Sequence, residues 1–313
     1  MKRCLCCYKP ILSDDADYHP LCAKRFFGSK DVPLLSFSHA DINKMAQVVV
    51  QNRTTVTGIQ AKLSLDIAHD SQGLPQRLTI VGVMGRYILK PQTEQFTALP
   101  EMEDLTMHLA EIAHIPTVPH ALIRFTDGEL NYITRRIDRT DDGAKLPMED
   151  MCQLTDRMTE QKYQGSYELI ASTIQRYSSA SKLDVINFWE QVVFSWIVGN
   201  ADMHLKNFSL ISSIPGHYRL APTYDQVSTA IIMPEDTEET ALVLQGFNKK
   251  LMKSDFIHAM EDSDVDEKVI HRIISRFAKC RDSWFDFIDC SFITEVQKQQ
   301  LKNLIDERLN RLS

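Results

Sequence analysis

Residues 199–207 read Gly-Asn-Ala-Asp-Met-His-Leu-Lys-Asn and directly follow an apolar run, 192–198, whose composition indicates a buried helix. Beyond this polar loop the sequence predicts a strand pair, Phe208–Ile211 against Tyr218–Leu220, which leads into Ala221-Pro222-Thr223-Tyr224-Asp225. A buried helix, a polar loop and a hairpin that ends on an acidic residue therefore follow one another directly. This order decides the fold class.

Three polar side chains of this segment have the spacing that phosphoryl transfer requires. Transfer to a hydroxyl needs a carboxylate that orients the hydroxyl and accepts its proton, and oxygen ligands for Mg²⁺. Asp202 and Asn207 lie five residues apart, as the base and a metal ligand of a protein-kinase catalytic loop do. Asp225 stands where the second metal ligand follows the hairpin. Each residue alone could be a loop cap or a turn residue, but the ordered set predicts phosphoryl transfer.

This segment closely resembles the catalytic segment of the HipA-like kinases, in which Asp-x-His-x-Lys-Asn replaces the usual His-Arg-Asp signature. Further segments match family motifs in the expected order, so that the likeness covers residues 36–300. These segments are the phosphate loop at Thr57–Leu63, the nucleotide-lysine strand at Tyr87–Pro91, the start of the Glu-bearing helix at Leu99–Glu103, and the interlobe hinge with its continuation at Arg136–Arg139 and Glu149–Gln153.

The resemblance implies an α+β, two-lobed protein-kinase-like fold with a β-rich N-lobe over residues 36–138 and an all-α C-lobe over residues 139–313. Residues 1–35 would form a separate small Cys-rich module. The periodicity of the sequence agrees with this order, because residues 59–91 alternate as strands do and residues 101–114 have a helical period that Pro116 ends. Strands are also expected at Ala121–Phe125 and Leu130–Thr134, and helices at 166–178, 183–198, 254–261, 265–279 and 295–311.

The resemblance also assigns roles to single residues. Lys90 would hold the α- and β-phosphates of ATP, and Glu103 would fix Lys90, although either residue alone reads as a solvated surface group. His204 would support the catalytic loop, and a purely structural histidine is an equally good reading. The catalytic set is then Asp202, His204 and Lys206; the ATP-binding set is Thr57, Gly58, Lys62, Lys90, Glu103, Arg135, Ile137, Asn207 and Asp225; and Mg²⁺ is assigned to Asn207 and Asp225.

The phosphate loop departs from the family pattern in two ways. Gly58 is its only glycine, and the family's loop serine is replaced by Thr57, with Thr55 two residues earlier. The loop hydroxyl of the family is autophosphorylated, so the resemblance implies Thr55 and Thr57 as phosphorylation sites. A phosphate there would place negative charge beside the ATP phosphates and block ATP binding. The alternative is that both are β-branched residues of a strand edge.

The position of the phosphate loop indicates which form of the family the chain resembles. In longer HipA-like kinases a further subdomain precedes the loop, but here Thr57 is reached too early for it. The short form, HipT, is the toxin of a system with a small HipS-like antitoxin and a HipB-like helix-turn-helix DNA-binding protein. The resemblance implies an aminoacyl-tRNA synthetase as the phosphorylated protein, with tryptophanyl-tRNA synthetase expected.

Two other functions remain possible from the residues. A pseudokinase binding module would be expected to lack part of the set Lys90, Glu103, Asp202, Asn207 and Asp225, which is intact here. A small-molecule phosphotransferase of the aminoglycoside or choline type carries its histidine before the catalytic Asp, whereas here the histidine follows it.

The N-terminal cysteines form a separate pattern. Cys4-x₂-Cys7 and His19-x₂-Cys22 offer two close pairs of soft ligands, which suits a structural tetrahedral Zn²⁺ site. Cys6 is left over. The alternative is a metal-free module in which reduced cysteines pack as small apolar side chains.

Composition limits the other functions. With 43% hydrophobic and 25% charged residues the chain is ordinary for a globular protein. Its net charge of −7 argues against charge-driven binding to nucleic acid. No signal peptide is evident, and the run 192–198 is too short to cross a bilayer. Seven cysteines without an export signal predict reduced thiols and a cytoplasmic location.

Overall fold

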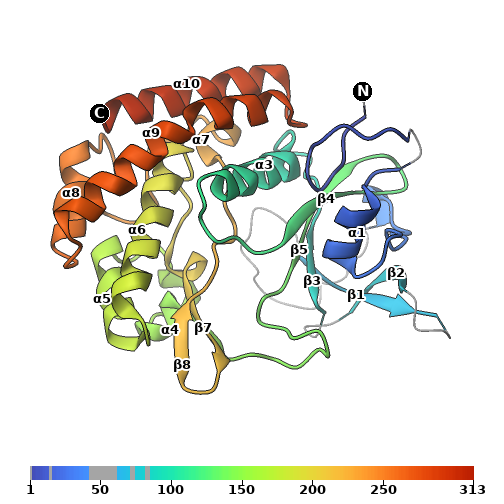
Figure 1. Cartoon of the computed structure of the whole chain (residues 1–313), viewed down its shortest axis with the longest axis horizontal. Helices are drawn as coiled ribbons and strands as arrows, with labels where there is room; N and C mark the ends of the chain where they lie inside the picture. The colour runs from blue at the N-terminus through green and yellow to red at the C-terminus, as the bar shows by residue number, and fades with distance from the viewer. Residues whose placement is uncertain (1, 14–15, 42–61, 71–74, 82–84) are drawn as a thin grey trace. The chain divides into compact units, whose positions relative to one another are not determined.

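A computed structural model describes residues 2–13, 16–41, 62–70, 75–81 and 85–313 of the chain (Figure 1). The chain divides into two compact units. The first comprises Met1–Asp104, Val118–Ala144 and Cys290–Phe292, and the second comprises Leu105–Thr117, Lys145–Asp289 and Ile293–Ser313. The expected domain limits at residues 35 and 138 stay predictions.

The first unit is built on a five-stranded antiparallel sheet in the order β2-β1-β3-β5-β4. Alternate side chains of β1, such as Leu65 and Ile67, are buried, so the alternation in the sequence did predict a half-buried sheet. At Gly128 the turn between β4 and β5 has a φ of 92°, which favours glycine. The strands are β1 (Leu63–His69), β2 (Pro75–Ile80), β3 (Tyr87–Lys90), β4 (His120–Arg124) and β5 (Leu130–Arg135).

The N-terminal residues belong to this same unit and pack on its sheet. Helix α1 (Pro20–Phe27) begins with proline, which lacks the N–H that a first turn cannot use, and ends at Gly28 in the left-handed region. Its Phe26 and Phe27 rings lie 5.9 and 6.1 Å from the ring of Tyr87 on β3. Figure 1 shows α1 beside these strands.

The second unit is mainly helical. Helix α3 (Leu99–Ile112) begins in the first unit, and its residues from Leu105 onward belong to the second. Helix α6 contains nearly all of the apolar run 192–198, which is buried throughout as predicted. Helices α9 and α10 lie side by side (Figure 1). The remaining elements are α4 (Met151–Leu154), α5 (Tyr167–Tyr177), α6 (Ser181–Ile197), α7 (Thr229–Ile232), α8 (Lys253–Glu261), α9 (Glu267–Asp289), α10 (Glu295–Arg311) and the 3₁₀ turns η1 (Thr159–Gln161) and η2 (Leu205–Asn207).

A three-stranded sheet accompanies these helices. It contains β6 (Met148–Asp150), β7 (Ser209–Ile214) and β8 (His217–Leu220) in that order. The expected hairpin is therefore present as β7 and β8, and β6 adds a strand that the sequence did not predict. The expected mixture of strands and helices is therefore present, with the correction that the second unit is not purely helical.

Helix α9 extends ten residues beyond its expected end at residue 279. Trp284 and Ile288 continue its buried stripe, and the indole N–H of Trp284 donates to the carbonyl of Leu109, 2.8 Å away. These buried contacts outweigh the mostly polar residues 279–283 that interrupt the apolar pattern. Among the helices of the described residues, none combines the length and apolar character needed to cross a bilayer.

Candidate active site

The segment that contains Asp202 begins with a turn that favours glycine. Gly199 has a φ of 74°, in the left-handed region. A Cβ at this position would lie 2.5 Å from Leu304 Cδ2 and 2.9 Å from the Cβ of Ala230. The carbonyl of Gly199 accepts the Ala230 N–H at 2.9 Å and the Thr229 hydroxyl at 3.2 Å. The end of α6 is thereby tied to α7, and the polar loop leaves the helix in one fixed direction.

Asp202 is held from both its side chain and its backbone. Its Oδ1 accepts a hydrogen bond from the Tyr163 hydroxyl at 2.7 Å, and its N–H donates to Asn200 Oδ1 at 3.1 Å. Its carbonyl accepts from Asn207 Nδ2 at 2.9 Å. The amide nitrogen of Asn207 is thus committed to the loop, which leaves its oxygen as the group that can bind a cation. The donor set predicted for Mg²⁺ is the Asp225 carboxylate and the Asn207 amide oxygen, and both are oxygen ligands of the kind that this ion prefers.

Asp225 is tied to the same loop. Its φ is 56°, a left-handed conformation that costs a non-glycine residue about 1–2 kcal/mol, and such strain gathers at functional sites. Asn200 Nδ2 donates to the carbonyl of Asp225 at 3.3 Å and to Gln226 Oε1 at 3.0 Å. The Tyr224 hydroxyl donates to the carbonyl of Lys206 at 3.1 Å. The structure therefore brings Asp202, Asn207 and Asp225 into one hydrogen-bonded segment.

His204 is a buried member of this segment. Burial lowers the pKa of His204, although the charges of Asp202 and Asp225 oppose the shift. Its ring packs edge-on against Tyr163 at 5.1 Å, and its Nδ1 has no hydrogen-bond partner within the described part of the chain. The role of His204, supporting the loop or purely structural, stays a prediction.

Lys206 forms an ion pair with Asp150, a residue for which the sequence predicted no role. Its Nζ lies 2.6 Å from Oδ2 of Asp150. The other oxygen of Asp150 accepts the Gln153 N–H at 3.0 Å and caps α4. One carboxylate thus fixes both α4 and the catalytic loop. Asp150 lies in the segment Glu149–Gln153, which resembles the family's sequence after the hinge. Nothing in the sequence around Tyr163 indicates that its hydroxyl contacts Asp202.

The first unit carries a buried ion pair. Lys90 Nζ on β3 lies 2.5 Å from Glu103 Oε1 on α3, with side-chain exposures of 6% and 4%. The ammonium also lies 5.4 Å from the centre of the Tyr132 ring, at the position of β5 opposite Lys90. A buried lysine is rare unless it is paired or bound to an anion. This pair is therefore a candidate phosphate-binding group.

The other predicted nucleotide-binding residues in the described part of the chain lie near one end or the other of strand β3. Lys62 directly precedes Leu63, which pairs with Leu89, so Lys62 lies at the same end as Lys90. Arg135 pairs with Tyr87, about 10 Å along the ladder from Lys90. Ile137 follows in the turn after β5. Thr55, Thr57 and Gly58 lie outside the described residues.

The four predicted zinc ligands form one cluster. The ligand atoms of Cys4, Cys7, His19 and Cys22 all lie within 4.8 Å of one another. Cys4 is buried and the other three are half-buried. Zinc binding by these four residues stays a prediction.

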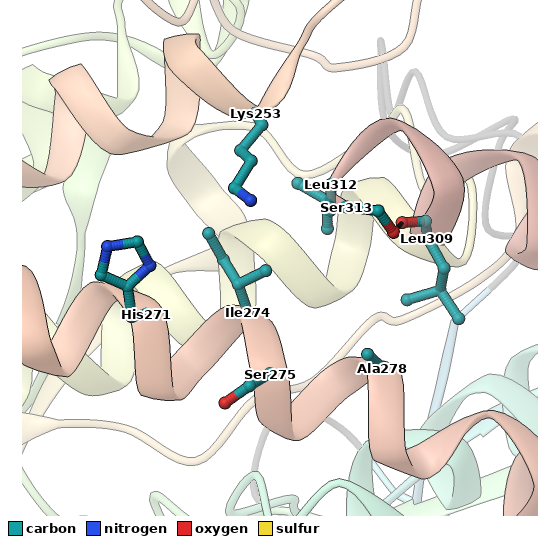
Figure 2. Close-up of a pocket in the computed structure, with 8 residues that line it drawn as sticks. All are labelled: Lys253, His271, Ile274, Ser275, Ala278, Leu309, Leu312 and Ser313. Atoms are coloured by element: carbon teal, nitrogen blue, oxygen red, sulfur yellow. Dashed lines mark hydrogen bonds between the residues drawn. The ribbon is translucent and has the colours of Figure 1, made fainter.

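A small pocket of about 240 Å³ lies in the second unit between α8, α9 and α10 (Figure 2). It contains none of the predicted site residues. Its lining residues are Lys253, His271, Ile274, Ser275, Ala278, Leu309, Leu312 and Ser313.

The fold is that of the protein-kinase-like proteins, as two solved structures show. One is a chain of the complex of HipA, HipB and operator DNA from the Shewanella oneidensis MR-1 toxin–antitoxin system, with a TM-score of 0.66 and 17% identity over 83% of this chain and 64% of that one. The other is the Helicobacter pylori proinflammatory kinase CtkA, with a TM-score of 0.54 and 16% identity over 72% of this chain and 86% of that one.

Residues 54–284 match the model of the HipA-like C-terminal domain, and the chain belongs to this family. Three relatives carry the name "Putative kinase". "Putative kinase Y4dM" of Sinorhizobium fredii is 30% identical over 70% of this chain and 56% of its own length, and Y4mE of the same organism is 29% identical over 56% and 43%. The Haemophilus influenzae relative is 27% identical over 82% of this chain and 84% of its own length. The chain thus spans about half the length of the two Sinorhizobium relatives.

Proposed function

We propose that this chain is an ATP- and Mg²⁺-dependent kinase that transfers a phosphoryl group to a serine or threonine hydroxyl of a protein. The observation that carries the proposal is the single hydrogen-bonded segment holding Asp202, Asn207 and Asp225. The buried pair of Lys90 and Glu103 supports it independently. The family membership and the kinase-named relatives agree with it.

Each residue has a defined task in this reaction. Asp202, oriented by Tyr163, would accept the proton of the attacking hydroxyl. Lys90, held by Glu103, would bind the α- and β-phosphates of ATP as a fixed positive charge. Asn207 and Asp225 would hold Mg²⁺. When bound there, the ion neutralises charge on the phosphates.

We further propose that the kinase is a growth-inhibiting toxin of the short HipT form. Its expected partners are a HipB-like helix-turn-helix protein and a small HipS-like antitoxin, and its expected substrate is an aminoacyl-tRNA synthetase such as tryptophanyl-tRNA synthetase. The likeness to a chain of the Shewanella HipA, HipB and operator DNA complex supports a toxin–antitoxin role. The net charge of −7 favours a protein partner over direct contact with nucleic acid.

We propose that autophosphorylation of Thr57 and Thr55 regulates the kinase activity. A phosphate on either residue adds about two negative charges close in sequence to Lys62 and would compete with the ATP phosphates. The kinase would then silence itself.

The test is incubation of the purified protein with labelled ATP and a cell lysate, with phosphosites mapped by mass spectrometry. Asp202→Ala and Asp225→Ala should each lower transfer on the order of 10³-fold. Asp282→Ala, at an exposed side chain, is the matched control and should transfer like the wild type. Near wild-type transfer by either active-site variant would refute the assignment. Transfer to small alcohols but to no protein would favour a small-molecule phosphotransferase.

A further inference from the structure

Outside the residues of the proposed kinase site, the first unit carries a cluster of three thiols and one imidazole. We propose that Cys4, Cys7, His19 and Cys22 bind one structural Zn²⁺, which holds the N-terminal module on the sheet. The Sγ atoms of Cys7 and Cys22 lie 3.4 and 3.9 Å from Nδ1 of His19. Zinc bond lengths of about 2.3 Å to sulfur and 2.05 Å to nitrogen give a tetrahedral S···N edge of about 3.6 Å. The observed distances bracket this value.

The first ligand pair sits on a tight turn. The N–H of Tyr8 donates to the carbonyl of Cys4 at 2.9 Å, and the N–H of Cys4 donates to the carbonyl of Lys9 at 3.0 Å. Tyr8 has a φ of 59°, which costs a non-glycine residue about 1–2 kcal/mol. A metal that joins Cys4 and Cys7 offsets this strain, and the turn places both thiols on one side.

The second ligand pair sits at the start of α1. His19 is the N-cap and Cys22 lies in the first turn, so their side chains share one side of the helix end. Nε2 of His19 lies 3.1 Å from the carbonyl of Pro10. When Nε2–H donates to this carbonyl, the lone pair of Nδ1 faces the thiols. Metal-bound histidines in proteins are oriented by this kind of second hydrogen bond.

The composition of the cluster selects zinc and a structural role. Three thiolates and one imidazole in a tetrahedral arrangement suit Zn²⁺, and four protein ligands leave no position for a reactant. Each thiol loses its proton to solvent when it binds, so the bound site carries one net negative charge. The N-terminal end of the α1 dipole favours this charge. Cys6 lies outside the cluster.

The turn between Cys4 and Cys7 connects directly to α3. The Tyr8 hydroxyl donates to Asp104 Oδ2 at 2.8 Å, and the other oxygen of Asp104 lies 2.6 Å from Nδ1 of His120 on β4. Asp104 follows Glu103, the partner of Lys90. The metal therefore fixes Tyr8, and Tyr8 positions the start of α3. Any effect on phosphoryl transfer rests on the proposed function, whereas the presence of zinc does not.

The main chain connects the module to the sheet as well. The N–H of Leu122 on β4 donates to the carbonyl of Leu5 at 3.0 Å, and the Tyr18 hydroxyl donates to the carbonyl of Leu122. Leu5 lies between Cys4 and Cys7, and Tyr18 precedes His19. Both ligand pairs are thus adjacent to a residue that contacts β4, and one metal would hold the two segments together.

The experiment measures metal content in the full chain purified without chelators. Elemental analysis should find about one Zn²⁺ per chain in the wild type. Replacement by Co²⁺ should give the visible bands of a tetrahedral cobalt–thiolate site. Cys7→Ser, Cys22→Ser and His19→Ala should each weaken zinc binding on the order of 100-fold or more. His19→Cys should keep the metal, because four thiolates also bind zinc tetrahedrally.

The matched control is Cys6→Ser, which removes a neighbouring thiol and should keep about one Zn²⁺ per chain. Zinc-free folded wild type, a disulfide within the cluster, or equal loss of zinc from Cys6→Ser and Cys7→Ser would overturn the proposal. The wild-type zinc and cobalt measurements remain decisive if a ligand variant does not fold. Because they need no ATP, failure of the zinc proposal is distinguishable from failure of the kinase proposal.

Discussion

Glu103→Gln tests the buried pair of the first unit. The substitution keeps the side-chain shape and removes the charge that lies 2.5 Å from Lys90 Nζ. At an effective dielectric constant of about 20, two unit charges at this distance attract by about 7 kcal/mol before desolvation is subtracted. Since both side chains are 6% exposed or less, removal of one partner leaves a charge in a nearly dry site. We expect the free energy of unfolding to fall by about 3–5 kcal/mol.

Asp289→Asn is the matched control, because Lys302 Nζ lies 2.6 Å from Oδ1 of an Asp289 side chain that is 62% exposed. Water screens this pair, and the expected loss is below about 1 kcal/mol. Urea denaturation of each full-length variant measures the change in the free energy of unfolding. One spectroscopic probe in the first unit reports on Glu103→Gln, and another in the second unit reports on Asp289→Asn. Equal losses in the two variants would refute the reasoning from burial.

Replacing both partners separates stability from function. The double variant Lys90→Met with Glu103→Leu removes both charges and should regain most of the stability lost in Glu103→Gln. It should nevertheless fail to transfer phosphate, because no positive charge remains at this position to hold ATP. A double variant that transfers phosphate like the wild type would remove Lys90 from the proposed mechanism.

Two further predictions rest on the structure, and a third rests on the sequence of the phosphate loop. Burial raises the pKa of Glu101 to about 7, so the folded state holds the proton more tightly than the unfolded state and stability falls as pH rises from 4.5 to 7. Glu101→Gln should therefore raise the free energy of unfolding at pH 8 by about 1–3 kcal/mol, measured by urea denaturation, and should have little effect at pH 4. Tyr163→Phe removes the hydroxyl that donates to Asp202, and steady-state kinetics should show kcat roughly tenfold lower with an unchanged KM for ATP; an unchanged kcat would contradict the orienting role. Phosphosite mapping should find phosphate on Thr57 and Thr55 in active protein and none in Asp202→Ala, and Thr57→Asp should bind ATP more weakly than Thr57→Ala.

The elements of the sheet and most helices were predictable because their apolar periods are regular. Strands β4 and β5 and helix α10 begin and end within a residue or two of their expected limits. Strand β6 has only three residues, too few for a period to show. The residues of helix α9 beyond 279 were missed because residues 279–283 are mostly polar, whereas the buried Trp284 and Ile288 continue the helical stripe beyond them.

The candidate site was predictable where its residues are close in sequence. Asp202 and Asn207 share one loop, and their spacing carries chemical information. The contact of Tyr163 with Asp202 spans 39 residues and depends on how the turn after η1 packs, which no local pattern encodes. Asp150 could have been noticed as a helix cap, but its ion pair with Lys206 spans 56 residues. Local spacing thus predicts which polar groups come together in the candidate site, and tertiary packing decides what orients them.

Gly199 also limits which missense mutations the protein can tolerate at the start of its predicted catalytic loop. Every amino acid that replaces glycine through a single base substitution carries a Cβ, and at Gly199 that atom meets Leu304 and Ala230. Each such substitution strains the turn, because the new Cβ must displace its neighbours at a φ of 74°. For a protein that inhibits growth, as proposed, such mutations would be selected in cells that lose its antitoxin. Alleles altered at Gly199 should therefore recur among survivors, beside those altered at the catalytic carboxylates.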